Sequence, residues 1–165
     1  MEQQRITEYK HTYFLTPGEC TPQGEIPITL ILTRIIEVAT EHANIWGVGY
    51  STLIKDNQSW VLSRVSIEMT SYPKVNKKYT FITWIESYNR HFSQRNFAIC
   101  DDNNNILGYA RTVWAVIDSN TREIVDISKF SFMQEVVSDR VCPIDTPTRL
   151  LPVRDGASIN HSFQY

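Results

Sequence analysis

Three titratable side chains between residues 37 and 42 are the strongest candidates for chemistry in this sequence. Glu37 and Glu41 are four residues apart, which places both carboxylates on one face of a helix, while His42 points about 100° away from Glu41. A carboxylate can act as a general base toward water if a nearby N–H group stabilises the developing oxyanion. The competing interpretation is structural: the glutamates form a solvated or interface edge of the helix, and His42 is held by hydrogen bonds.

Other catalytic arrangements are not supported by the residue spacing. The sequence contains neither a glycine-rich phosphate loop nor a G-x-S-x-G motif. Its histidines and cysteines are scattered without the spacing of metal ligands: His11, His42, His91, His161, Cys20, Cys100 and Cys142. We therefore expect no metal site and no cofactor, and we interpret the cysteines as structural.

The helix that carries these candidates is predicted between Pro27 and Gly47, which are typical of a helix start and a helix stop. Apolar residues recur on it at spacings of three and four: Leu32, Ile35, Ile36, Ala39, Ala43 and Trp46. Further apolar residues lie off this face: Ile31, Val38 and Ile45. A helix that is apolar on several sides is expected to be wrapped by other elements.

The rest of the chain predicts strands. We expect strands at 5–15, 60–72 and 106–118, a long β segment at 78–100 that bends near 89–91, a short return at 123–127 and a short helix at 132–137. On the strand at 60–72, alternation places Val61, Ser63, Val65, Ile67 and Met69 on one side. A sheet that curls around one long central helix satisfies this order, so the predicted class is α+β with a hotdog arrangement.

Bulk properties exclude several function classes. The chain has 165 residues, the size of one domain, and a net charge of −2, which provides no basic field for nucleic acid or anionic membranes. It contains no apolar run long enough to span a membrane and no apolar signal segment at its start. Three widely spaced cysteines are typical of reduced thiols, so we expect a cytoplasmic protein.

Two stretches carry a family resemblance. They are E-V-A-T-E-H-A-N-I-W-G, with Glu37, His42 and Gly47, and Y-P-K-V-N-K-K-Y-T-F-I-T-W, which is followed by G-Y-A-R-T-V-W-A-V-I-D-S-N-T-R. Over about residues 5–130 they resemble the amino-terminal half of acyl-acyl-carrier-protein thioesterases. The resemblance implies hydrolysis of fatty acyl-carrier-protein thioesters to free fatty acids, in fatty acid biosynthesis.

That family is built from two hotdog domains in tandem, which implies a domain organisation here. We expect a hotdog domain at 1–140, a linker at 141–157 and, at 158–165, the first strand of a second repeat, where Ile159, His161 and Phe163 alternate with polar residues. The family's catalytic D-x-N-x-H motif would follow that strand. No catalytic residue is carried over, because the matching positions lie beyond Tyr165.

The resemblance also implies an acyl pocket and a carrier-protein contact. A helix wrapped by a sheet leaves an apolar gap, and the residues expected to line it are Ile36, Ala39, Ala43, Trp46, Trp60, Met69, Trp84 and Trp114. The acidic carrier would contact a basic surface formed by Lys74, Lys77, Lys78, Arg90 and Arg95. In the alternative interpretation the first set is ordinary core and the second decorates a solvated turn.

Two other functions remain open. One is a self-sufficient homodimeric hotdog thioesterase that acts on acyl-CoA, with Glu37 or Glu41 as the base. The other is a non-catalytic acyl-binding domain. In each case a homodimer is expected, because a lone hotdog leaves a sheet edge and apolar surface uncovered.

Overall fold

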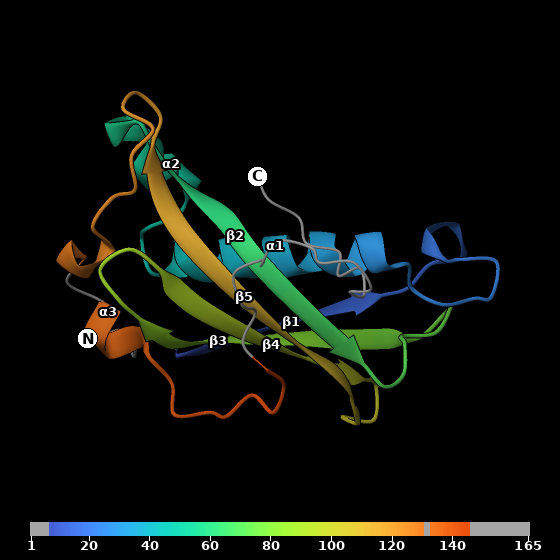
Figure 1. The fold of residues 1–165 in the computed structure, drawn as a ribbon. Helices are drawn as coiled ribbons and strands as arrows, with labels where there is room; N and C mark the ends of the chain where they lie inside the picture. Colours follow the sequence, from blue (N-terminus) through green and yellow to red (C-terminus); the bar gives the residue numbers. More distant parts are fainter. Residues whose placement is uncertain (1–6, 131–132, 146–165) are drawn as a thin grey trace, which may run out of the picture.

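The computed structural model describes residues 7–130 and 133–145, which form one antiparallel sheet with a long helix on one face (Figure 1). The strands are β1 (Glu8–Phe14), β2 (Gln58–Met69), β3 (Lys78–Tyr88), β4 (Ser93–Asp101) and β5 (Ile106–Asp118). The helices are α1 (Ile28–Ile45), α2 (Tyr50–Leu53) and α3 (Met133–Val136), with short 3-10 turns at Pro17–Glu19, Ile54–Asp56 and Ile127–Lys129.

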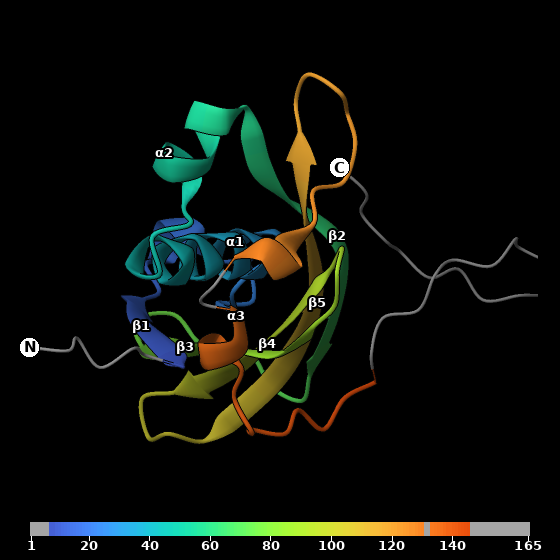
Figure 2. The same ribbon diagram turned by 90° about the vertical axis from the view of Figure 1, so that its left-hand side faces the viewer.

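The sheet has the strand order β1-β3-β4-β5-β2, and all neighbouring strands are antiparallel. Figure 2 shows the strands curving around α1, which lies in the hollow of the sheet. The predicted α+β hotdog fold is therefore confirmed, including one long helix between the first two strands.

The buried stripe of α1 lies about one residue away from the predicted one. The fully covered residues are Ile31, Ile35, Val38, Ala39 and His42, whereas Leu32, Ile36 and Ala43 are half-exposed on the flank of the helix. The sheet wraps α1 as expected, but it covers one side of the helix, and Ile45, one of the apolar residues off the predicted face, is exposed. Gly47 ends the helical region with a positive φ of 75°, which favours glycine.

A β-bulge in β2 changes which residues face α1. The pairing of β2 with β5 shifts between Leu62 and Arg64, leaving Ser63 as an extra residue. An extra residue reverses the alternation of side chains, so Leu62 faces the core together with Val65 and with three further residues of this strand, Trp60, Ile67 and Met69. The predicted alternation, which grouped Val61 with Val65, is wrong for the first half of the strand.

The predicted bend near residue 90 is a complete reversal between β3 and β4. The side-chain oxygen of Asn89 accepts hydrogen bonds from the backbone N–H groups of His91 and Phe92, at 2.9 and 2.8 Å, which holds the turn. The predicted turn at 101–105 is confirmed, because Asp101 accepts hydrogen bonds from the backbone of Asn103 and Asn105 between β4 and β5.

The back of the sheet, opposite α1, is crossed by residues 138–145, which we call the strap. Arg111 of β5 fastens it: its Nε donates to the carbonyl of Ile144 at 2.6 Å and its Nη2 to the carbonyl of Cys142 at 2.7 Å. The third nitrogen of Arg111 contacts the carboxylate of Glu86. A single guanidinium thus joins two strands to the strap.

Trp84 of β3 forms the second attachment of the strap. Its indole N–H donates to the carbonyl of Arg140 at 3.0 Å, and the Arg140 guanidinium lies 4.6 Å from the centre of the ring. Residues 141–145, the start of the expected linker, contain no helix or strand but pack on the sheet through Cys142 and Ile144. The rest of that linker and the expected strand at 158–165 lie outside the described residues.

Replacing Arg111 with methionine is expected to destabilise the fold through the strap. The change removes the donor to the carbonyls of Cys142 and Ile144 and the ion pair of Glu86, which keeps only its hydrogen bond from Asn96. This should lower the free energy of unfolding by about 2–4 kcal/mol. The matched control is Arg64→Met on β2, because Arg64 forms no ion pair with any described residue. Urea unfolding measures both variants, and equal losses in the two would contradict the role of Arg111.

Candidate functional site

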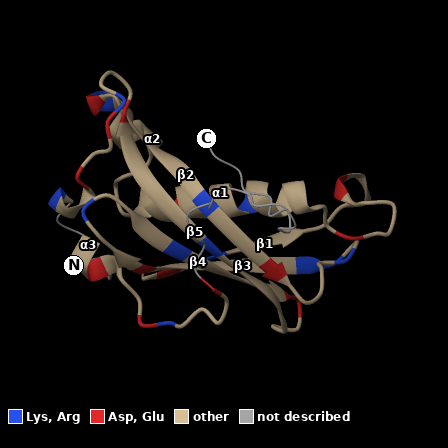
Figure 3. Ribbon diagram, in the orientation of Figure 1, with Lys and Arg blue, Asp and Glu red and all other residues tan. Residues whose placement is uncertain are grey.

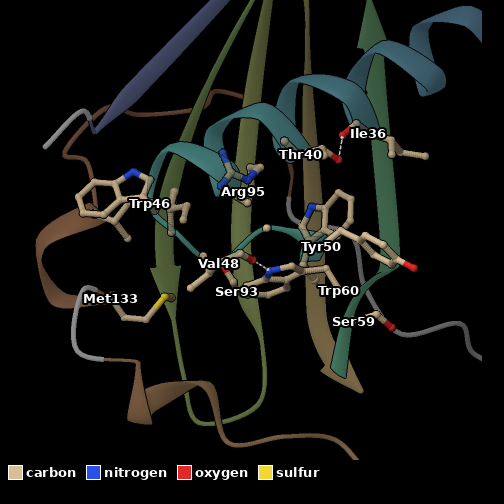
Figure 4. Close-up of a pocket in the computed structure, with 16 residues that line it drawn as sticks. Ile36, Thr40, Trp46, Val48, Tyr50, Ser59, Trp60, Ser93, Arg95 and Met133 are labelled. Carbon is tan, nitrogen blue, oxygen red and sulfur yellow. Dashed lines mark hydrogen bonds between the residues drawn. The ribbon is translucent and has the colours of Figure 1, made fainter. Parts of the chain in front are cut away.

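An apolar cavity of about 200 Å³ lies between the C-terminal half of α1 and the sheet (Figure 4). It is bounded by α1 and the chain that follows it, by the inner faces of β2 to β5, and by α3. The lining residues from α1 and the following segment are Ile36, Ala39, Thr40, Ala43, Trp46, Val48, Gly49 and Tyr50. Those from the sheet and α3 are Ser59, Trp60, Ile85, Ser93, Arg95, Trp114, Met133 and Val136.

The cavity exists because side chains on α1 become smaller along the helix. Ile31 and Ile35, in its first half, fill the space above the sheet as part of the main core. In the second half, Ala39 and Ala43 occupy the positions that face the cavity, and their methyl groups leave the space open. The walls are completed by three large rings: Trp46, Trp60 and Trp114.

The tryptophans of the sheet present carbon surface to the cavity because the protein satisfies their polar atoms. The indole N–H of Trp60 donates to the carbonyl of Val48 at 2.9 Å, and that of Trp114 donates to the hydroxyl of Thr112 at 2.8 Å. With these groups paired internally, the rings offer apolar faces to a ligand.

The cavity has an open side and a closed side. Tyr50 is 65% exposed, and Thr40 is exposed on the outer face of α1. Other lining residues are buried: Met133 and Val136 of α3, and Arg95, which is 6% exposed. We call the exposed part of the lining, at Tyr50 and Thr40, the open side and the buried part, which includes Arg95, the closed side.

Six of the eight residues predicted to line an acyl pocket do line this cavity: Ile36, Ala39, Ala43, Trp46, Trp60 and Trp114. Met69 packs against the main core instead. The prediction for Trp84 is wrong, because alternation along β3 turns its neighbours Thr83 and Ile85 toward α1 and Trp84 toward the strap.

Sequence reasoning missed several lining residues, and three of them carried a readable signal. Ile85 lies four residues after Phe81 on β3, and every second residue of a strand faces the same side. Alternation alone therefore assigns both to the inner face. Met133 and Val136 are three residues apart in the predicted short helix, which indicates a single apolar face. Val48 and Tyr50 reach the cavity because of the path that the chain takes after α1, and no sequence pattern indicates that path.

Arg95 lies inside the molecule, which corrects its assignment to a carrier-binding surface. It sits on the inner face of β4, where its Nη1 donates to Nδ1 of His42 at 2.8 Å and to the hydroxyl of Thr83 at 3.1 Å. Burial lowers the pKa of this guanidinium to about 10, because the charged form is removed from water.

His42 is fully buried beneath α1 and does not line the cavity. Its Nδ1 faces Arg95, its Nε2 lies 3.1 Å from the indole nitrogen of Trp46, and its ring stacks on Tyr9. The guanidinium of Arg95 can only donate, so Nδ1 is the accepting nitrogen of a neutral His42 ring and the proton lies on Nε2.

Glu41 joins α1 to the edge strand β1 rather than facing the cavity. Its Oε2 accepts a hydrogen bond from the Tyr9 hydroxyl at 2.6 Å and lies 2.9 Å from Nδ1 of His11. The hydrogen bond to Glu41, with burial, raises the pKa of Tyr9 to about 12. The carboxylate therefore stabilises a neutral phenol across the contact between helix and strand.

Glu37 makes the equivalent contact one turn earlier. It accepts hydrogen bonds from the Tyr13 hydroxyl at 3.1 Å and from Nη1 of Arg34 at 2.9 Å. Arg34 also binds Glu19 at 3.0 Å, which connects the turn after β1 to the helix. We call the contacts of Glu37 and Glu41 with β1 the polar seam. Neither carboxylate of the polar seam lines the cavity.

The described lining of the cavity lacks the side chains that most often act as general bases. It includes neither a carboxylate nor a histidine nor a cysteine, and its titratable residues are Tyr50 and Arg95. Across the described residues, no group of three His, Cys, Asp or Glu side chains is placed to hold a metal ion. No helix in the described part of the chain is long and apolar enough to cross a membrane.

The predicted basic surface residues divide between two ends of the sheet (Figure 3). Lys74, Lys77 and Lys78 lie at the start of β3, and Lys74 is paired with Glu25 at 3.0 Å. Arg90 lies beyond the other end of β3 and is paired with Asp126 at 3.1 Å. The three lysines are therefore near the N-terminal end of α1, and Arg90 is at the cavity end.

Comparison with known proteins relates this architecture to solved structures. The crystal structure of an acyl-ACP thioesterase from Bacteroides thetaiotaomicron matches with 32% identity and a TM-score of 0.82, over 90% of this chain and 60% of that one. The 12:0-ACP thioesterase from Umbellularia californica matches with 18% identity and a TM-score of 0.76, over 93% of this chain and 63% of that one. At this lower identity the second match shows the shared fold alone.

Sequence comparison agrees. The chloroplastic oleoyl-acyl carrier protein thioesterase 1 of Arabidopsis thaliana is 25% identical over 129 residues, which are 73% of this chain and 35% of the relative. The chain thus spans about a third of the curated plant relative. The family model of the acyl-ACP thioesterase N-terminal domain matches residues 7–134, which include the whole sheet, α1 and the cavity-lining residues except Val136. This chain therefore belongs to the acyl-ACP thioesterase family and carries its N-terminal domain.

Proposed function

We propose that this chain is the acyl-binding half of an acyl-ACP thioesterase. The hotdog domain holds the fatty acyl chain while the thioester to the carrier protein is hydrolysed to a free fatty acid and a thiol. One observation carries the proposal: an apolar cavity, walled by three tryptophans and closed at one end, lies in a domain of this family.

The chemistry requires groups that the cavity does not supply. Hydrolysis needs a water molecule activated by a base, attack on the thioester carbonyl, and donors that stabilise the resulting oxyanion. In the part of the chain that the structure describes, no carboxylate or histidine lines the cavity, and Glu37 and Glu41 are engaged in the polar seam. We therefore assign the hydrolytic groups to a second hotdog repeat, with the strand expected at 158–165 as its start.

The partner in this proposal is acyl carrier protein, which presents the acyl group as a phosphopantetheine thioester. Its acidic surface would be attracted to Lys74, Lys77 and Lys78. Of the predicted contact residues, Arg90 lies at the cavity end of β3, in the same hairpin as the lining residues Ile85 and Ser93. Binding of acyl carrier protein to this chain should weaken with added salt more than binding of methyl decanoate does, and equal salt dependence would contradict this contact.

We also propose that the domain pairs with a second hotdog domain through a sheet edge. β1 and β2 are the two edge strands, and the β2 edge is long. An unpaired edge exposes backbone donors and acceptors that another strand can satisfy. Pairing of two copies gives a homodimer in solution, and a monomeric mass in sedimentation equilibrium would exclude it.

A cytoplasmic location fits the chemistry of the cysteines. Cys20, Cys100 and Cys142 are free thiols, as in a reducing compartment. Burial raises the pKa of the Cys100 and Cys142 thiols, so both are poorly reactive at neutral pH. Recovery of the protein in a secreted fraction would contradict this location.

The 165-residue chain alone is expected not to hydrolyse acyl-carrier-protein or acyl-CoA thioesters. The Glu37→Ala and Glu41→Ala variants test the competing enzyme directly, because each removes one candidate base. We expect thiol release at the buffer rate for all three proteins. Each variant should lose about 1 kcal/mol of stability, because it loses hydrogen bonds of the polar seam. Turnover that one substitution abolishes would instead identify a complete enzyme.

Filling the cavity is expected to weaken binding of a neutral acyl chain. Ala43→Leu adds bulk inside the cavity and should weaken methyl decanoate binding by about tenfold, since overpacking costs of order 1–3 kcal/mol. The control is Thr33→Leu, an exposed position of α1 away from the cavity. Isothermal titration calorimetry gives both affinities, and unchanged binding by Ala43→Leu would place the acyl chain elsewhere.

A further inference from the structure

Arg95 places a buried positive charge at the closed side of an otherwise apolar cavity. Among the described residues that line the cavity, it is the only charged one. No carboxylate of the described residues forms an ion pair with it. Arg34 and Arg111, which are also mostly buried, each bind a glutamate. Arg95 thus differs from comparable arginines of the same domain.

The hydrogen bonds of Arg95 leave one edge of the guanidinium available. A guanidinium has five N–H donors, two on each terminal nitrogen and one on Nε. Both bonds from Arg95 to described residues use Nη1, and they reach His42 and Thr83. No described residue accepts a hydrogen bond from Nε or Nη2. These two atoms form the side-by-side pair of donors that binds both oxygens of a carboxylate.

An uncompensated charge at this depth is costly for the folded protein. A buried ion needs a partner of opposite charge or a full set of hydrogen bonds, and here the protein supplies neutral partners on one side only. A ligand that brings a carboxylate to the closed side of the cavity supplies both the charge and the two acceptors.

We propose that the cavity binds a linear aliphatic carboxylate with its carboxylate first, paired with Nε and Nη2 of Arg95. This rests on the proposed function, in which the same cavity takes the acyl chain. The hydrocarbon then lies against Trp60 and Trp114, and its other end reaches the open side at Tyr50 and Thr40. The carboxylate belongs either to a free fatty acid or to the far end of an acyl group.

Calorimetric titration of the full chain near neutral pH tests this with matched ligands. Decanoate and methyl decanoate have the same hydrocarbon chain and differ in charge. Decanoate is expected to bind at least about tenfold more tightly, because a charge-assisted pair in a buried site is stronger than a neutral contact. Equal affinities, or tighter binding of the ester, would overturn the inference.

Two variants test whether Arg95 is the residue that causes the preference for decanoate. Arg95→Gln removes the buried charge and should abolish the preference, so that decanoate and methyl decanoate bind this variant with about equal affinity. Arg90→Gln makes the same change on an exposed residue five positions earlier and should leave the preference intact. If decanoate remains preferred in Arg95→Gln, the carboxylate binds elsewhere. Thermal unfolding supplies an independent readout: decanoate should raise the melting temperature of the unmodified chain more than the ester does.

The remaining outcomes separate this inference from the proposed function. If methyl decanoate binds without any preference for decanoate, the cavity holds acyl chains and the inference fails alone. If neither ligand binds, the inference and the proposed function both fail.

Monomethyl decanedioate identifies the source of the carboxylate. Tighter binding than decanoate indicates the far end of an acyl group, whereas equal or weaker binding indicates a free fatty acid.

Discussion

The packing of Ile31, Ile35 and Val38 on the inner face of the sheet is the contact on which the rest of this domain depends. It sets the distance between α1 and the strands along the part of the helix that ends at Val38. Because a helix is rigid over this length, that distance persists toward its C-terminal end, where the small residues Ala39 and Ala43 face the cavity and His42 contacts Arg95 of the sheet. The cavity is thus a consequence of two different side-chain sizes on one straight element.

Much of the fold could be predicted because its determinants are local. Pro27 and Gly47 delimit α1, and the turns at Asn89 and Asp101 are made by their own side chains. The errors concern the face on which a residue lies. The bulge at Ser63 reverses the alternation of β2, and no local pattern marks it. Charged residues are rarely buried on the inner face of a sheet, so the charge of Arg95 led to the prediction of a surface position.

The role of the two glutamates illustrates a different limit. Their spacing indicated a shared helix face correctly, but catalytic and structural carboxylates look alike in sequence. What distinguishes them here is contact with Tyr9 and Tyr13, which come from β1, some thirty residues earlier. Such long-range pairing follows from the position of β1 beside β3, on the side of α1 opposite β2. It is a property of the assembled sheet.

The strand order also constrains when the domain can be completed during synthesis. β3, β4 and β5 follow one another as hairpins, so each can pair as soon as it has left the ribosome. β2 must wait, because Gln58 pairs with Asp118. Trp60 and Trp114 lie on these two strands, so the walls of the cavity meet only after β5 has emerged. Until then, the apolar residues of α1 and β2 remain without their final cover.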